Sequence, residues 1–201
     1  MTAASVNLTG DQLDAVVKKL GGAEGVKRLL SGELSVVETP AADFPVWKTV
    51  RLGVHKSAEA YRKALATGNH RAGSWVNDFL GKPAYQSAKN ETEVDLVVLS
   101  VGDLGFKKGA LYSQICEKAV ALGLELCPAE VGPALRLAYE DQPRGERLII
   151  ATKSAAGSSD ELDLFSMEVS GGGGLWLRGD CGPSDRYWEA DRRFVFVRPR
   201  S

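Results

Sequence analysis

The sequence contains few of the residues that form disulfides or bind transition metals. Its 201 residues include three cysteines and two histidines, His55 and His70. Small secreted proteins held by disulfides have more cysteines, arranged in pairs. Zinc sites combine Cys and His at short spacing, and no Cys-x-x-Cys or comparable cluster occurs here. The sequence therefore predicts no metal site and a reducing, cytoplasmic compartment, and it assigns no role to His55.

Long hydrophobic runs are missing as well. A membrane-spanning helix needs about 18 or more consecutive apolar residues, whereas the apolar runs here are short, such as Leu96–Leu99. Residues 1–10 have neither the basic start nor the apolar core that secretory signals carry. We expect no membrane segment and no secretory signal.

Motifs for nucleotide or redox cofactors are also missing. The four-glycine run Gly171–Gly174 invites comparison with a phosphate-binding loop, but such loops lead into a helix whose N-terminus meets the anion. The strand-like segment Leu175–Leu177 follows instead, and there is no Gly-Lys-Ser/Thr element. We interpret the run as the tip of a β-hairpin and predict no cofactor.

The charged and hydrophobic content of the sequence is typical of a folded globular protein. Lys and Arg number 25, Asp and Glu number 26, and 44% of the residues are hydrophobic. Disordered chains combine weaker hydrophobicity with a larger net charge. The charge is uneven, because residues 41–90 carry eight basic and three acidic side chains. Residues 41–90 are therefore the one clearly basic stretch of the chain.

Helical periodicity and proline positions divide the chain into three parts. Apolar residues recur at helical spacing twice within the first 30 residues. Two prolines among small residues then suggest a linker. The sequence predicts an N-terminal helical pair over 1–38, a linker over 39–46 and a main domain over 47–201.

Within the main domain, helical patterns mostly precede strand patterns. Val94–Val101 is dense in Val and Leu, as in a buried strand, and Ala110–Leu122 has clear helical spacing. After Gly123 the apolar period shifts towards two, with turn signals between most segments. The strand candidates there are Leu124–Leu126, Leu135–Tyr139, Arg147–Lys153, Leu164–Val169, Leu175–Arg178 and Phe194–Val197. We therefore predict an α+β fold whose helical N-terminal half packs on a mostly antiparallel C-terminal β-sheet.

One motif carries a resemblance. The run Gly-Leu-Glu-Leu-Cys-Pro-Ala-Glu-Val-Gly-Pro at 123–133, followed by Leu135-Arg136-Leu137, resembles the signature of an uncharacterised bacterial protein family. The similarity extends to Leu175–Leu177 and Phe194–Val197, and covers most of residues 47–201. The resemblance implies a bacterial source and supplies no activity, cofactor or catalytic residue.

The same motif holds two candidate ligand-binding residues. Pro128 and Pro133 stiffen the two ends of the loop, so Glu130 is presented on a rigid segment near Arg136. This carboxylate and guanidinium could orient a ligand or form a structural ion pair. A hydrolase or transferase built around Glu130 and Arg136 is one functional hypothesis.

Cys127 offers a further candidate. It lies at a strand end, and His70 lies on a turn before a helix, so the fold could bring them together as a nucleophile pair. The alternative is that Cys127 is a small buried hydrophobic residue, as free cysteines often are.

The basic segment supports a nucleic-acid hypothesis. Two short helical patterns with a tight turn between them have the length of a helix-turn-helix motif. Basic side chains could neutralise phosphates, with aromatic residues stacking on bases. Alternatively, Tyr61 and Trp75 face the core and the basic residues form a solvated surface. The candidate nucleic-acid-binding residues are Lys56, Arg62, Lys63 and Arg71.

The C-terminal segment 186–200 holds five arginines and four aromatic residues. Phe194 and Phe196 should share one face of a strand, with Val195 and Val197 on the other, as in an inner strand. The arginines could pair with neighbouring acidic residues, or they could bind an anion.

These observations favour a non-catalytic cytoplasmic binding or regulatory module, with an unknown protein or small molecule as its partner. The alternative is a nucleic-acid-binding protein that uses residues 47–90. The third hypothesis is the hydrolase or transferase at Glu130 and Arg136. A deep pocket containing both residues would favour the enzyme, and loss of binding on replacing the basic residues would favour nucleic acid.

Overall fold

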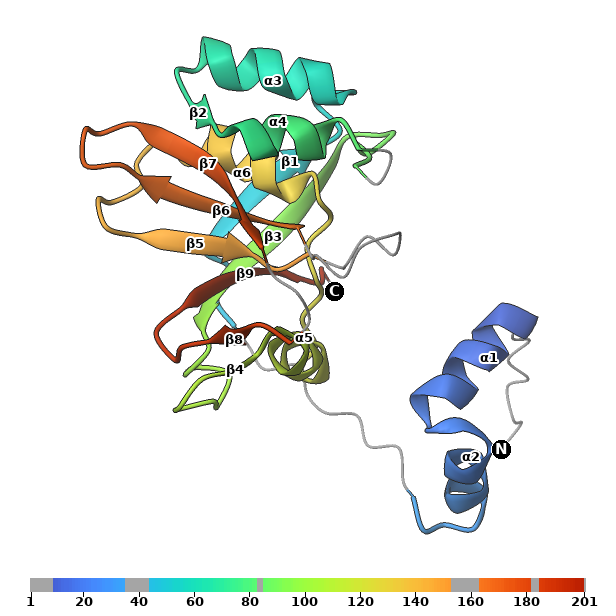
Figure 1. The fold of residues 1–201 in the computed structure, drawn as a ribbon. Helices are drawn as coiled ribbons and strands as arrows, with labels where there is room; N and C mark the ends of the chain where they lie inside the picture. Colours follow the sequence, from blue (N-terminus) through green and yellow to red (C-terminus); the bar gives the residue numbers. More distant parts are fainter. Residues whose placement is uncertain (1–8, 35–43, 83–84, 153–162, 182–184, 201) are drawn as a thin grey trace. The chain divides into compact units, whose positions relative to one another are not determined.

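The computed structural model describes residues 9–34, 44–82, 85–152, 163–181 and 185–200 (Figure 1). The chain divides into two compact units with the boundary between residues 39 and 40. Most of the linker predicted over 39–46 lies outside the described residues, so the three-part division stays a prediction. None of the described helices has the length and apolarity needed to cross a membrane.

The first unit is a helical pair, α1 (Gly10–Lys19) and α2 (Gly22–Leu30). Gly21 has a left-handed φ of 88° and allows the sharp turn between them. A Cβ on Gly25 would lie 1.5 Å from the backbone oxygen of Leu20, so only glycine permits this close packing. Gly25 is the one buried residue of α2, and Leu30 is 82% exposed. The pair therefore gains little stability from its own packing.

The second unit contains a seven-stranded sheet in the order β1-β3-β9-β5-β6-β7-β2. Its strands are β1 (Lys48–Leu52), β2 (Arg71–Ala72), β3 (Thr92–Ser100), β5 (Arg147–Ile150), β6 (Asp163–Val169), β7 (Leu175–Cys181) and β9 (Arg193–Arg198). Four neighbouring pairs are antiparallel, whereas β5–β9 and β2–β7 are parallel. The unit is α+β, but its sheet is mixed and curled, so the prediction of a mostly antiparallel sheet is wrong. The reason is that β9 inserts between β3 and β5 instead of pairing only with its neighbours in sequence.

The predicted separation of helices from strands is also wrong. Strands β1, β2 and β3 come from the first half of the chain, and α5 (Tyr112–Ala121) and α6 (Val131–Ala138) lie after β3. The segment Leu135–Tyr139, predicted as a strand, belongs largely to α6. Its apolar residues alternate, but Val131, Ala134 and Leu135 also have helical spacing, and Pro133 suits a first helical turn.

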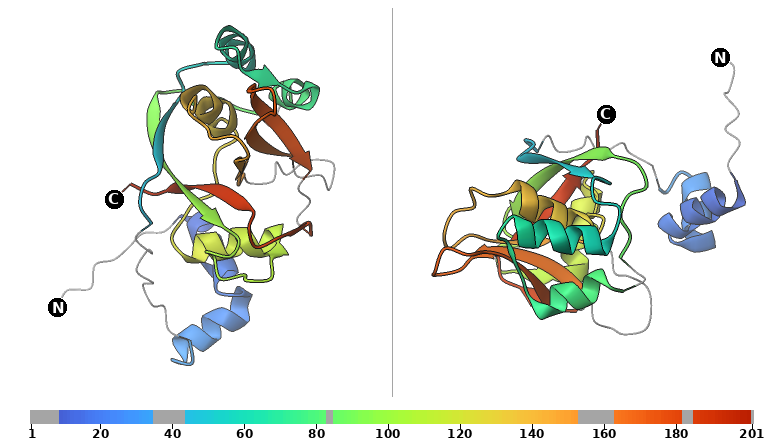
Figure 2. Two further views of the ribbon diagram at one scale, coloured as in Figure 1. Left: turned by 90° about the vertical axis from the view of Figure 1, so that its left-hand side faces the viewer. Right: turned by 90° about the horizontal axis from the view of Figure 1, so that it is seen from above.

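Helices cover both faces of the sheet. On one face, α3 (Ala58–Thr67), α4 (Ser74–Leu80) and α6 enclose a core with β1, β6 and β7. On the other, α5 packs with the small sheet formed by β4 (Ala110–Leu111) and β8 (Tyr187–Trp188). The left-hand view of Figure 2 shows α3, α4 and α6 at one end of the curled sheet and α5 at the other. The inner strand β9 serves both cores, because Phe194 and Phe196 belong to the second and Val195 and Val197 to the first.

Candidate functional site

The Glu130 side chain lies in a buried network of neutral donors. Its Oε1 accepts hydrogen bonds from the Gly53 N–H (2.8 Å) and the Tyr61 hydroxyl (2.7 Å). Its Oε2 accepts one from the Ala88 N–H at 2.6 Å. The residue is 1% exposed. The carboxylate therefore joins three chain segments and has no surface to offer a ligand.

Arg136 is fully buried in a different network. Its guanidinium donates to the Gln142 side chain and to the Tyr139 carbonyl, which lies at the C-terminal end of α6. Burial lowers the pKa of Arg136 to about 10. No ion pair among the described residues joins Glu130 to Arg136. The structure thus places the two candidates in one helix region but does not combine them into one site.

No interaction among the described residues joins Cys127 to His70. The Cys127 thiol donates to the Val195 carbonyl at 3.3 Å, and burial raises its pKa well above the ordinary value. His70 is buried beside β2, and burial and then the charge of Arg136 lower its pKa below 6.5. A nucleophilic cysteine needs a lowered pKa, so these contacts fit the alternative of a buried structural thiol.

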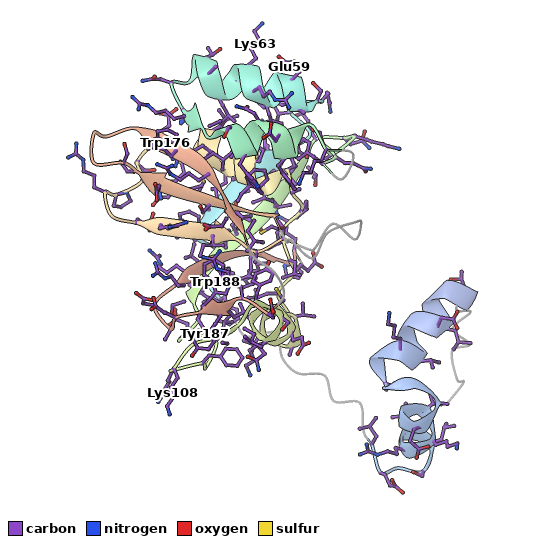
Figure 3. The ribbon with its side chains drawn as sticks, viewed as in Figure 1. Glu59, Lys63, Lys108, Trp176, Tyr187 and Trp188 are labelled. Atoms are coloured by element: carbon purple, nitrogen blue, oxygen red, sulfur yellow. The ribbon has the colours of Figure 1, made fainter. Side chains whose placement is uncertain are left out.

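The basic candidate residues contact different segments of the chain. Arg62 pairs with Glu59 at 3.2 Å and donates to the Asn77 carbonyl at 2.6 Å. Lys56 donates to the Lys89 carbonyl at 3.0 Å, and Lys63 is exposed on α3 (Figure 3). In place of a helix-turn-helix turn, the segment between α3 and α4 forms β2 and pairs with β7. Tyr61 is fully buried in the first core.

Arg71 is the exception among these candidates. Its guanidinium carbon lies 5.5 Å from the ring centroid of Trp176 on β7. It also lines a hollow of about 220 Å³ together with Asn69 and the glycine run Gly172–Gly174. That run is the tip of the β6–β7 hairpin, as the interpretation of Gly171–Gly174 requires.

A larger concave surface than this hollow lies beside β5 and β8. A pocket of about 330 Å³ has arginine and aromatic walls, and a second of about 230 Å³ shares Arg147, Ile149 and Arg192 with it. The two therefore form one continuous depression, which we call the arginine groove. Its principal side chains are Arg147, Arg186, Tyr187, Trp188, Arg192 and Arg193.

Carboxylates hold the arginines of this groove in place. Asp180 lies between two of them, at 2.6 Å from Arg147 and 3.9 Å from Arg186. The Asp180 side chain is only 9% exposed, whereas those of Arg147 and Arg186 are 40% and 38% exposed. A buried carboxylate thus positions two guanidinium groups that still reach solvent.

Aromatic rings complete the groove. The Arg186 guanidinium carbon lies 4.3 Å from the ring centroid of Trp188. The Tyr187 hydroxyl donates to the Lys108 carbonyl at 2.6 Å, and a Cβ on Gly109 would come within 2.8 Å of that hydroxyl. The Tyr187 residue is nevertheless 56% exposed. The Tyr187 ring is therefore fixed at its hydroxyl end, while much of the residue faces solvent (Figure 3).

A row of one aromatic and two charged side chains lies on β7, beside the groove. Trp176, Arg178 and Asp180 alternate along the strand and so share one face of the sheet. The Arg178 guanidinium carbon lies 4.3 Å from the Trp176 ring centroid, and Arg178 pairs with Glu168 of β6 at 2.5 Å. One end of this row contacts the arginine groove through the Arg147–Asp180 pair, and the other end contacts Arg71 of the hollow through Trp176.

The sequence contained part of this signal. The arginine and aromatic content of residues 186–200 suggested an anion site as one alternative. Arg147 and Asp180 could not be found, because only the pairing of β5, β6 and β7 brings them to Arg186. Among the described residues, there is no group of three His, Cys, Asp or Glu side chains placed to hold a metal ion.

Comparisons with protein-family models, with curated proteins and with solved structures find no match. The geometry of the chain itself therefore carries the functional argument.

Proposed function

We propose that this protein is a non-catalytic binding module whose arginine groove holds a phosphate-bearing ligand. The observation that carries the proposal is that Arg147, Arg186 and Arg192, each about two-fifths exposed, line one pocket. The planar guanidinium fork matches the oxygens of a phosphate group and forms paired, charge-assisted hydrogen bonds with it.

The chemistry of the lining argues against an apolar ligand and against catalysis. Ile149 is the one aliphatic side chain of the two pockets. The three carboxylates of the lining each lie near an arginine. Glu189 is 2.9 Å and Asp191 is 3.8 Å from Arg192, and Glu146 is 2.6 Å from Arg193. A general base needs an accessible lone pair near its substrate, and these pairs instead support a positioning role.

The carboxylates also limit how strongly the groove attracts anions from a distance. Because each arginine has an acidic neighbour, long-range attraction is weak, and affinity must come from direct hydrogen bonds. We therefore expect binding of a ligand with several phosphate oxygens in preference to single small anions.

The proposed location is the cytoplasm. Cys116 and Cys127 are free thiols, and both are at least partly buried in the cores. Such thiols are compatible with a reducing compartment. The contacts of Glu130 and Arg136 do not support the hydrolase or transferase hypothesis, and those of Lys56 and Arg62 do not support a helix-turn-helix.

Calorimetric titration of the full chain with inorganic tripolyphosphate at low salt tests the proposal. We expect binding by the wild-type chain and a clear loss of affinity in Arg147→Gln/Arg186→Gln. Arg51→Gln is the matched control, because Arg51 is an exposed arginine paired with Glu93 on the edge strand β1, and strands β3 and β9 separate β1 from β5. Absence of binding at low salt, or equal affinity in all three chains, would refute the proposal.

Stability has to be separated from binding in this test. The double variant removes both arginines that pair with the buried Asp180, so it is expected to melt earlier than the wild-type chain. Arg147→Lys keeps the charge but not the planar fork. It is expected to retain the wild-type melting temperature within a few degrees and still to bind tripolyphosphate more weakly.

A further inference from the structure

The arginine groove does not end at its two pockets. The row Trp176, Arg178, Asp180 on β7 continues from it to the hollow at Arg71 and Gly172–Gly174. Asp180 lies four positions after Trp176, which corresponds to about 13 Å of strand at the usual rise per residue. A single phosphate group spans far less than this, so the surface suits an extended ligand.

Cationic side chains recur along this path. Arg71 and Arg178 lie over the ring of Trp176, and Arg147 and Arg186 flank Asp180 at the other end of the row. Each nucleotide carries one phosphate charge, and these charges repeat about every 3.4 Å along the axis in a strand stacked as in B-DNA. A strand lying along β7 would therefore bring several successive phosphates past these guanidinium groups.

The exposed ring of Tyr187 favours a ligand that carries planar bases over a plain polyphosphate. Its ring is held by Lys108 and Gly109, is more than half exposed, and lines the same pocket as Arg147 and Arg192. An aromatic side chain that is already fixed loses little conformational entropy on binding. Such a ring is a stacking surface for a planar base, and it offers nothing to an inorganic phosphate chain.

From this arrangement we infer that the groove binds single-stranded nucleic acid, with a base stacked on Tyr187 and the backbone following β7. A single strand is favoured over a duplex because its bases are free to stack on a protein ring. The inference rests on the proposed function. Its surface differs from the one predicted at Lys56, Arg62 and Lys63, and only Arg71 belongs to both.

Fluorescence anisotropy with labelled ten-nucleotide DNA and RNA strands tests the inference on the full chain. Tyr187→Ala is expected to weaken binding about tenfold, which lies within the usual contribution of one stacked base. Tyr187→Phe, which keeps the ring, should lose less. Arg147→Gln/Arg178→Gln should weaken binding further, whereas Lys63→Gln and Arg51→Gln, outside the groove, should leave it unchanged.

The salt dependence of the affinity and competition by a duplex give two further tests. If about three phosphates are contacted, the slope of log affinity against log salt should be roughly −2 for a single strand. An unlabelled hairpin duplex should compete poorly. A duplex that competes as well as the single strand, or a larger loss in Lys63→Gln than in the groove variants, would overturn the inference.

The outcomes separate the two proposals. Tripolyphosphate binding that depends on the groove, together with oligonucleotide binding that ignores Tyr187, would leave the proposed function standing and refute the base-stacking inference. Absence of both kinds of binding would refute both. Should Tyr187→Ala fail to fold, crosslinking of the wild-type chain to a 4-thiouridine strand gives an independent answer. Crosslinks at residues 185–193 would support the inference, and crosslinks confined to α3 would overturn it.

Discussion

The hydroxyl of Tyr61 on α3 donates a 2.7 Å hydrogen bond to Oε1 of Glu130, 69 positions away, in the loop before α6. The same carboxylate accepts the backbone N–H groups of Gly53 and Ala88. It thereby ties the end of β1, helix α3 and the segment before β3 to the motif at 123–133. The motif residue that looked most like a ligand-binding group is a structural acceptor.

Glu130 should therefore matter for stability. Glu130→Gln replaces one acceptor oxygen with an amide donor, and we expect a loss of about 1–3 kcal/mol in the free energy of unfolding. Tyr61→Phe removes one hydrogen bond to a charged group and should cost about 1.5–3 kcal/mol. Urea unfolding measures both. Glu117→Gln, at an exposed position of α5, is the control and should change stability by less than about 0.5 kcal/mol.

Gly132 explains another part of the motif. A Cβ at this position would lie 2.4 Å from the ring of Phe165, which is fully buried on β6. Gly132→Ala should destabilise the protein by about 1–3 kcal/mol through overpacking. Gly171→Ala, at a position where a Cβ would meet nothing within 4 Å, is the matched control. The interpretation fails if the two variants unfold at the same urea concentration.

His70 predicts a pH dependence of stability. Burial and then the charge of Arg136 lower the pKa of His70 below its ordinary 6.5, while Glu140 opposes the shift. Above pH 6.5 the imidazole is neutral in the folded and unfolded chains and has no effect. As the pH falls below 6.5, the unfolded chain binds a proton more readily, so stability is lost until the folded pKa is reached.

The measurement is urea unfolding between pH 7.5 and 5, compared with His70→Gln. The wild-type chain should lose more stability over this range than the variant does. Parallel curves for the two proteins would show that His70 does not carry the effect.

Cys127 should be chemically inert in the folded protein. Burial raises the pKa of its thiol well above the ordinary value, and burial raises that of Cys116 to about 11. Alkylation requires the thiolate and access to it. We expect iodoacetamide to modify Cys127 at pH 7.5 only at the rate of unfolding, as followed by peptide mass spectrometry. Fast modification of the native chain would restore the nucleophile hypothesis.

Several helices and strands could be predicted from the local sequence pattern. The dense apolar run Val94–Val101 contains most of β3, the spacing in Ala110–Leu122 matches α5, and Gly171–Gly174 joins β6 to β7. The two apolar faces of Phe194–Val197 indicated an inner strand, and β9 lies inside the sheet. These features are set by side-chain period and by glycine, which act over a few residues.

Other features depended on contacts between distant segments. The alternation in Leu135–Tyr139 fitted a strand as well as a helix, and packing against α3 and β1 accompanies the helix that forms. The mixed sheet follows from the insertion of β9 beside β5, which no local pattern encodes.

The candidate site shows the same division most clearly. Composition alone identified a C-terminal segment rich in arginine and aromatic residues, and it allowed both an anion site and structural ion pairs. Tertiary structure brings Arg147, Asp180 and Arg186 together from three places in the chain, and it buries Glu130 and Arg136 in separate networks. The physical reason is that residue type decides which chemistry a side chain can perform, whereas strand pairing and burial decide which partners and how much solvent it meets.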